Sequence, residues 1–347
     1  MTQTKNYRIT WVDSMKAFFI LAVVLYHTNI TQEIRTAAYI VCLPAFFFVA
    51  GLFTNTKLPP FTFLNKKTLR LLIPYIIWGV LAWIFWFLGT SRYGSSIESD
   101  ISWWEPLLGL LYGRRSELLQ NGPLWFLCCI ISLEWIYYFV SRIPKQWVRW
   151  IVIFCLAEVG CGVAYIGKNW IWGISATLII LPIYAIGAEY SWYIKEKMSS
   201  LRGINLILIF IISLAGLWIG YTYNNEISLC DSIIGNPCFY YISVISAIGF
   251  WLSIALVIEK KHDPYLHFIT GIIGRNTLFI LCTHMMTFSL IKGIAVLCLV
   301  PLHFFETTIG CIVLWVGTFI ILLPMAYLVN RYCPILVGKR KCAQKEL

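Results

Sequence analysis

Apolar runs separated by short polar connections recur along the whole chain, each about 20 residues long, which is the length a helix needs to cross a bilayer. This pattern predicts an all-α, polytopic membrane protein with a single domain over residues 1–347. The ten predicted spans cover approximately residues 13–30, 36–54, 70–89, 123–141, 147–166, 170–188, 204–222, 238–258, 276–298 and 307–330.

Three features interrupt this regular pattern. Pro44 falls inside the second span, where a proline kinks a helix and frees backbone groups. The connection 55–69 is basic and contains two adjacent prolines. The connection 90–122 mixes aromatic and charged residues, so it could hold a short interfacial helix around Trp103–Tyr112.

The basic residues indicate an orientation, because cytoplasmic segments of membrane proteins carry an excess of Lys and Arg. With the N-terminus inside, each predicted inner segment holds at least three such residues, and only the long outer loop reaches that number. We therefore expect both termini to be cytoplasmic. An odd number of spans would put the basic C-terminal segment on the other side, so the orientation agrees with ten.

The composition is that of a membrane protein. Hydrophobic residues make up 59% of the chain and charged residues 12%, and the mean hydropathy is +0.76, whereas soluble proteins carry about 25% charged residues. The net charge of +11 lies in the connections and forms no basic-aromatic patch, so we expect membrane lipids and no nucleic acid as partners. The first apolar run lacks a small-residue cleavage site and should act as a signal anchor.

The first predicted span carries a basic residue and a histidine on one helix face. Eleven residues from Lys16 to His27 return to nearly the same face of a helix and rise roughly 16 Å. Asp13 and Ile20 fall near the same stripe. An imidazole at that depth is costly unless it faces a cavity or a partner, so this stripe predicts a functional site.

Five stretches, taken together and in this order, carry a resemblance to a known family. They are the opening segment 8–27, Pro-x-Phe-Phe-Phe-x-x-Gly at 44–51, Lys-Lys-Thr-Leu-Arg at 66–70, Asn-Gly-Pro-Leu-Trp-Phe-Leu at 121–127 and Arg-Asn-Thr-Leu-Phe-Ile-Leu-Cys-Thr-His at 275–284. Over its whole length the chain resembles the membrane acyltransferase-3 family, above all the branch of sugar O-acetyltransferases such as fucose 4-O-acetylase-like proteins. The resemblance implies a multi-pass enzyme of the bacterial cytoplasmic (inner) membrane. Such an enzyme moves an acetyl group from cytoplasmic acetyl-CoA to a hydroxyl of a cell-surface or lipid-linked glycan.

The resemblance implies that His27 is the catalytic histidine, preceded by a basic residue with ten positions between them. Many members have arginine at that position, and Lys16 keeps the charge but loses the bidentate fork. Acetyl transfer from a thioester to a hydroxyl needs a base for the alcohol proton, and imidazole is suited to that task. His27 could also carry the acetyl group, or hydrogen-bond a neighbouring helix for packing alone.

Three further ionisable residues lie inside predicted spans. His284 lies roughly 13 Å into the ninth span and could orient His27, contact the acyl group or make a structural hydrogen bond. Glu134 and Glu158 could neutralise a cation, orient a histidine or bind a sugar hydroxyl, or form a buried structural pair. The remaining histidines are expected in solvated connections: His262, His267 and His303.

A basic cluster at the mouth of the third span could hold the phosphates of coenzyme A. Ordinary positive-inside anchoring is the alternative. The candidate donor-binding residues are Lys16, Lys66, Lys67 and Arg70, with Arg8 and Arg275 as weaker candidates. We find no metal-ligand set, no glycine-rich phosphate loop and no Gly-x-Ser-x-Gly motif in the sequence.

Trp125, Arg114 and Arg115 are suited to an acceptor carbohydrate, because aromatic faces stack on sugar rings and charged groups bond hydroxyls. For Trp103 and Trp104 the ordinary interfacial role of tryptophan is favoured.

Two questions stay open at this level. Cys230 and Cys238 flank a predicted outer loop and could form a disulfide or remain thiols. The chain could instead be a proton-coupled transporter or flippase for a lipid-linked sugar, although the paired broken segments of a two-fold repeat are missing. An acyltransferase acting on a peptide, lipid or antibiotic is a third alternative.

Overall fold

The computed structural model describes residues 9–90, 101–198, 200–201, 203–224, 227–261 and 263–339. Within these ranges the chain is helical, and its β-type pairing is limited to one isolated bridge between Ser228 and Ile233. The predicted all-α class is confirmed. Arg8 and His262 lie outside the described residues.

Nine helices of the described chain are long and apolar enough to cross a bilayer, and they match the second to tenth predicted spans. They are α2 (Gln32–Leu52), the run of α3 (Pro60–Phe63), η1 (Leu64–Thr68) and α4 (Leu69–Phe85), then α7 (Trp125–Val140), α8 (Gln146–Tyr165), α9 (Ile174–Glu189), α11 (Ile204–Tyr223), α12 (Pro237–Lys261), α14 (Thr277–Leu297) and α15 (Thr308–Tyr332). The first predicted span corresponds to α1 (Thr10–Tyr26), which at 17 residues is short for a span.

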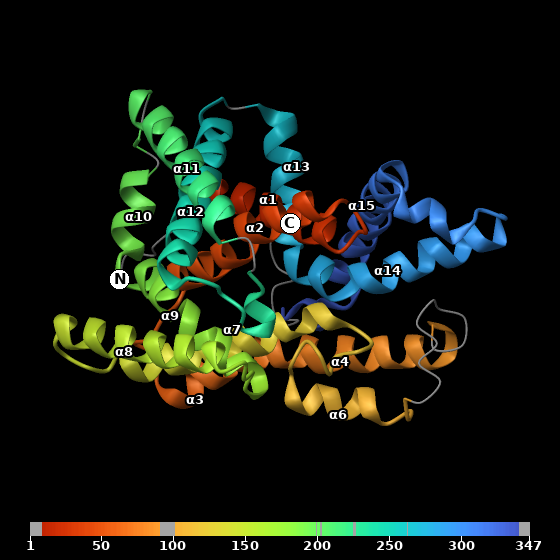
Figure 1. The fold of residues 1–347 in the computed structure, drawn as a ribbon, viewed down its shortest axis with the longest axis horizontal. Coiled ribbons are helices and arrows are strands. Elements are labelled where there is room, and N and C mark those ends of the chain that lie inside the picture. Colours follow the sequence, from red (N-terminus) through yellow and green to blue (C-terminus); the bar gives the residue numbers. More distant parts are fainter. Residues whose placement is uncertain are drawn as a thin grey trace.

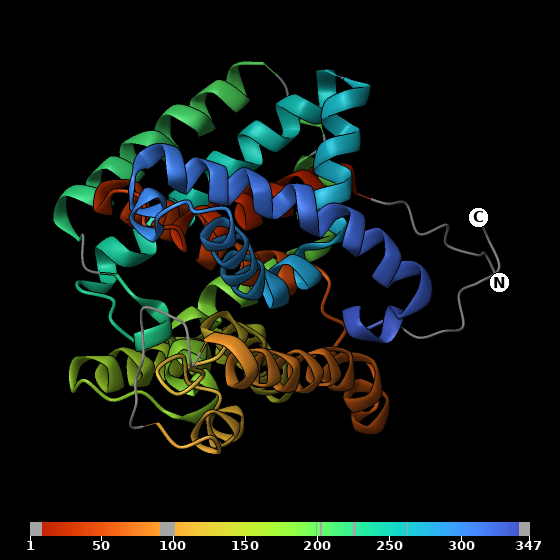
Figure 2. The same cartoon turned by 90° about the vertical axis from the view of Figure 1, so that its right-hand side faces the viewer.

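The helices are arranged in two layers (Figure 1). Figure 2 shows the chain from α3 to α8 as one layer beneath a second layer that contains α1 and α11–α15. Helices α2 and α9 join the layers, because α2 packs on α1 and α9, and α9 packs on α7 and α8.

Helix α1 is apolar on nearly all sides, which is typical of a helix surrounded by protein. The side chains of Trp11, Met15 and Phe19 are at most 1% exposed, and α1 packs against α2, α12, α13 and α14. The C-terminal end of α1, which bears His27, is therefore held inside the protein.

Glycines allow α2 and α9 to pack with their backbones in contact. A Cβ atom on Gly51 would collide with the carbonyl oxygen of Tyr184, and one on Gly187 would collide with that of Phe48. Only glycine lets two helices approach this closely. Helix α2 runs through Pro44 without a break in its helical assignment.

Three short helices lie in the connections: α6 (Glu105–Tyr112), α10 (Ser191–Met198) and α13 (Pro264–Arg275). The first confirms the helix expected around Trp103–Tyr112. The third was not predicted, although Asp263 accepts hydrogen bonds from the backbone of Tyr265 and Leu266 and caps it. An Asp-Pro start of this kind is a helix signal in the sequence.

Candidate active site

His27 and His284 lie side by side. His27 directly follows the last residue of α1, and its ring centroid is 5.1 Å from that of His284 on α14, with 45° between the ring planes. The two positions are far apart in sequence, and the contact of α1 with α14 brings them together. The sequence left the role of His284 open, and in the structure its ring lies against that of His27.

The orientation of the His284 ring is fixed by its backbone neighbour. Nδ1 lies 3.0 Å from the carbonyl oxygen of Ile280, which can only accept, so Nδ1 carries a proton in this bond. The side chain is 0% exposed, and Nε2 has no partner among the described protein atoms. His284 therefore keeps one buried ring nitrogen without a partner among the described protein atoms, in a ring that lies beside that of His27.

His27 lines a small cavity of about 30 Å³. Its wall combines aromatic rings, sulfur atoms and one guanidinium, and the residues are Val23, Tyr26, Tyr39, Cys42, Leu43, Arg115, Trp125 and Cys230. Trp125 and Arg115, both expected to bind acceptor, therefore share this cavity with His27.

The connection between α11 and α12 covers the small cavity. Arg115 Nη1 lies 3.5 Å from Asp231 Oδ2, and the backbone N–H of Cys230 donates to the hydroxyl of Tyr39 at 3.2 Å. Asn169 Nδ2 donates to the carbonyl of Cys230 at 2.8 Å. Burial, and next the carboxylate of Asp231, raise the pKa of the Cys230 thiol, so this cysteine is neutral near pH 7.

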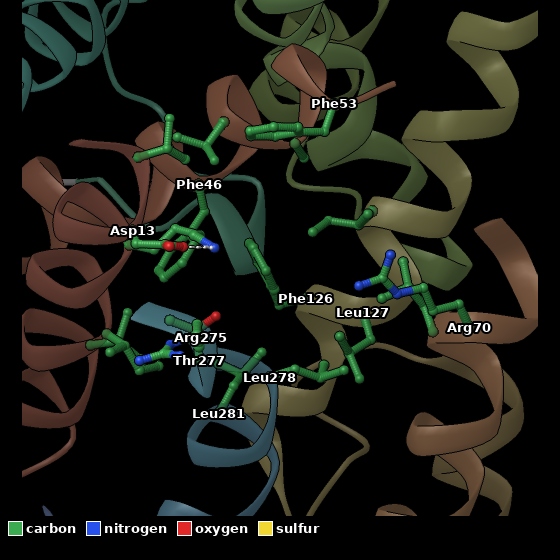
Figure 3. Close-up of a pocket in the computed structure, with 18 of the residues that line it drawn as sticks. Asp13, Phe46, Phe53, Arg70, Phe126, Leu127, Arg275, Thr277, Leu278 and Leu281 are labelled. Atoms are coloured by element: carbon green, nitrogen blue, oxygen red, sulfur yellow. Dashed lines mark ion pairs between the residues drawn. The ribbon is translucent and has the colours of Figure 1, made fainter. Parts of the chain in front are cut away.

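A second, much larger cavity of about 690 Å³ shares the wall residues Val23 and Leu43 with the small one. Most of its wall is apolar, but four cations line it: Lys16, Lys67, Arg70 and Arg275. Figure 3 shows Asp13 and Arg275 on one side of this cavity and Arg70 on the opposite side, with Phe126 and Leu127 between them. All four cations belong to segments that the sequence assigns to the cytoplasmic side.

Helix α1 contributes a continuous stripe to both cavities. Asp13, Lys16, Ile20 and Val23 line the large cavity, and Val23 and His27 line the small one. The predicted stripe is thus divided between the two cavities, with Asp13, Lys16 and Ile20 in the wall of the large one and His27 in the wall of the small one. Val23 and Leu43 are common to both linings, so they stand where the cavities meet.

Lys16 and Lys67 each lie beside a carboxylate. Lys16 Nζ is 2.8 Å from Asp13 Oδ1, and Lys67 Nζ is 3.4 Å from Glu134 Oε1. Lys67 also donates to the carbonyl oxygen of Phe53 at 3.0 Å. Glu134 is 5% exposed, and its Oε2 has no partner among the described protein atoms.

Lys66 and Lys67 lie together in a π-helical turn but face different surroundings. Both lie in η1, and such turns often occur at functional sites. Lys67 faces the large cavity, whereas Lys66 is exposed and lines neither cavity. Nearby on α10, burial and next the charge of Lys67 lower the pKa of Lys195.

Two other predicted residues lie away from both cavities. Glu158 is exposed on α8, so it forms no buried pair with Glu134. Arg114 pairs with Glu117 and donates to the carbonyl of Asn169 at 3.2 Å, which ties two outer connections together.

The structure also identifies cavity residues that the sequence did not suggest. Tyr26, Tyr39 and Cys230 line the His27 cavity, and Arg35 lies 5.2 Å above the ring of Tyr26. Tyr26 directly precedes His27 in the sequence, but no local signal distinguishes Tyr39 or Cys230.

Cys230 and Cys238 are both free thiols in the structure, the first buried and the second exposed. Among the described residues, no group of three or more His, Cys, Asp or Glu side chains is arranged to hold a metal ion.

Comparison with known proteins identifies one family. A family model described as an acyltransferase domain matches residues 9–331, which is nearly the whole chain. No curated protein and no solved structure gives a significant match.

Proposed function

The chain belongs to this acyltransferase family, and on that premise we propose that it is a membrane O-acetyltransferase with His27 at its reaction centre. The observation that carries the proposal is that two cavities share Val23 and Leu43 in their walls. One cavity is wide and lined by cations, and the other is narrow and lined by His27 and Arg115, with the ring of His284 packed beside that of His27. The donor would enter by the first cavity and the acceptor by the second.

Acetyl-CoA is the donor that suits the large cavity. Its phosphates would lie near Lys16, Lys67, Arg70 and Arg275, because ammonium and guanidinium groups bind phosphate strongly. The apolar wall beyond them suits the slender arm that bears the thioester. Lys16 to His27 spans roughly 16 Å along α1, so the arm would bridge the cationic rim and the imidazole.

The acceptor would be a hydroxyl of a cell-surface or lipid-linked glycan, approaching from the outer face of the bacterial cytoplasmic membrane. Trp125 and Arg115 border the small cavity and offer an aromatic face and hydrogen-bond donors to a sugar. The Arg115–Asp231 pair would have to open or shift as the sugar enters.

In the reaction, an imidazole nitrogen of His27 accepts the hydroxyl proton while the oxygen attacks the thioester carbonyl. The carbon–sulfur bond then breaks, and the departing thiolate takes up the proton. His284 would help to hold the His27 imidazole in position by ring packing. In a two-step variant the imidazole itself takes the acetyl group first. Label retained on the protein in the absence of acceptor would favour that variant.

The test uses purified protein, acetyl-labelled acetyl-CoA and surface glycans extracted from the producing cell. His27→Ala should lower label transfer by a factor of about 10² or more, the usual contribution of a general base. His303→Ala is the matched control, since His303 is exposed in an outer turn and its loss should leave transfer intact. Equal transfer by His27→Ala and wild type would contradict the proposal.

The same preparation in sealed vesicles tests the rival transporter. A proton-coupled carrier would move a lipid-linked sugar across the membrane without transferring label. Glu158, which such a relay would use, is exposed on α8 away from both cavities, so acyl transfer is the favoured function.

A further inference from the structure

We propose that Val23 and Leu43 form a constriction that limits the transferred acyl group to two or three carbons. The inference rests on the proposed function and adds to it the residues that set donor specificity. It follows from the shapes of the two cavities and from the residues they share.

The two side chains occupy the junction of the cavities. Val23 on α1 and Leu43 on α2 line both the large cavity and the small one. Val23 precedes His27 by four residues, which puts it one turn away on the same face of the helix. An acyl group that reaches His27 from the large cavity therefore has to pass between these two side chains.

The walls of the junction are rigid. Val23 is 5% exposed and Leu43 is 7% exposed, and both extend from helices that pack against each other. Tight contact between the backbones of α2 and α9 at Gly51 and Gly187 leaves α2 little freedom to move away. Side chains held in this way resist extra volume, as in any well-packed interior.

The room beyond the junction is small. The His27 cavity has a volume of about 30 Å³, whereas a single water needs roughly 10–15 Å³ by the same measure. An acetyl group fits such a space, and acyl chains longer than three carbons have to displace Val23, Leu43 or the aromatic wall. The large cavity, at about 690 Å³, imposes no such limit.

The experiment compares acetyl-, propionyl-, butyryl- and hexanoyl-CoA as donors. The readouts are free coenzyme A released and labelled acyl group recovered in extracted surface glycan. A methylene that does not fit an apolar site costs a factor of about 10–200, so wild type should use butyryl-CoA far less efficiently than acetyl-CoA. Val23→Ala and Leu43→Ala should each raise the butyryl-to-acetyl ratio of kcat/KM about tenfold or more.

Val24→Ala is the matched control. Val24 is the neighbour of Val23 on α1 and is 0% exposed, but it lines neither cavity, so this variant should keep the wild-type ratio. A gain of butyryl transfer cannot arise from misfolding, which makes the result independent of stability losses in the variants.

Two results would overturn the constriction while leaving the proposed function intact. One is a wild-type protein that uses butyryl-CoA as well as acetyl-CoA. The other is that Val23→Ala and Leu43→Ala retain acetyl transfer with an unchanged chain-length ratio. Absence of transfer from every thioester would contradict both the proposed function and this inference.

Discussion

At the residue scale, the two lysines of η1 differ in a way that sequence alone does not reveal. Lys66 and Lys67 are adjacent and were equal candidates for donor binding, yet only Lys67 lines the large cavity. The π-helical turn fixes this difference. The direction of a side chain within such a turn depends on its tertiary contacts, here with Glu134 and the carbonyl of Phe53.

Lys67→Ala should raise the KM for acetyl-CoA about 10- to 100-fold, the loss expected for one charge-assisted contact to phosphate. The kcat should change less, because Lys67 is remote from the reacting carbonyl in the proposed arrangement. Lys66→Ala is the matched control and should alter KM little. Steady-state kinetics at two salt concentrations provide the check, since an electrostatic contribution weakens as ionic strength rises. Equal effects of the two substitutions would contradict the assignment of Lys67.

Sequence alone also does not distinguish the two adjacent arginines of the outer loop. Arg114 and Arg115 are neighbours and were both expected to bind acceptor, but only Arg115 borders the His27 cavity. Arg114 pairs with Glu117 and donates to the carbonyl oxygen of Asn169, and these contacts connect two loops. Tyr39 and Cys230, which meet across 191 positions of sequence, could not be found from local pattern at all.

At the element scale, the helices are well predicted because a bilayer demands a fixed length of apolar chain. The second to tenth predicted spans all correspond to long apolar helices. What the apolar pattern misses is α13, a 12-residue helix in a predicted loop. Its Gly274 packs directly on the backbone of Asp13, and Ser14 donates to Thr270 at 3.1 Å, so α13 supports the polar end of α1 beside the large cavity.

The contact of α2 with α9 gives a prediction about stability. Gly187→Ala should destabilise the protein by about 1–3 kcal/mol, because its new methyl group would collide with the backbone of Phe48 and the helices would have to separate. Gly162→Ala is the matched control, since a Cβ there meets nothing within 4 Å and alanine favours helix. Thermal unfolding in detergent is the measurement. An unchanged midpoint for Gly187→Ala would show that α2 can yield, which would also weaken the rigid constriction.

At the scale of the whole molecule, the cations that line each cavity come from segments predicted to lie on the same side of the membrane. The cations of the large cavity come from segments assigned to the cytoplasm, and Arg115 and Cys230 of the small cavity come from segments assigned to the outside. Orientation was argued from the distribution of Lys and Arg alone. The proposed function requires this orientation, since a phosphate-bearing thioester is a cytoplasmic compound and a surface glycan is not.

The most direct test of the account is the sidedness of transfer across a sealed membrane. Labelled acetyl-CoA, which does not cross bilayers, is added to inverted and to right-side-out vesicles that contain the protein and the cell's own glycan acceptors. The account predicts transfer to glycan in inverted vesicles, little in right-side-out vesicles, and loss of transfer by a factor of about 10² or more in His27→Ala. Equal transfer in both orientations, or an undiminished rate without the His27 imidazole, would contradict it.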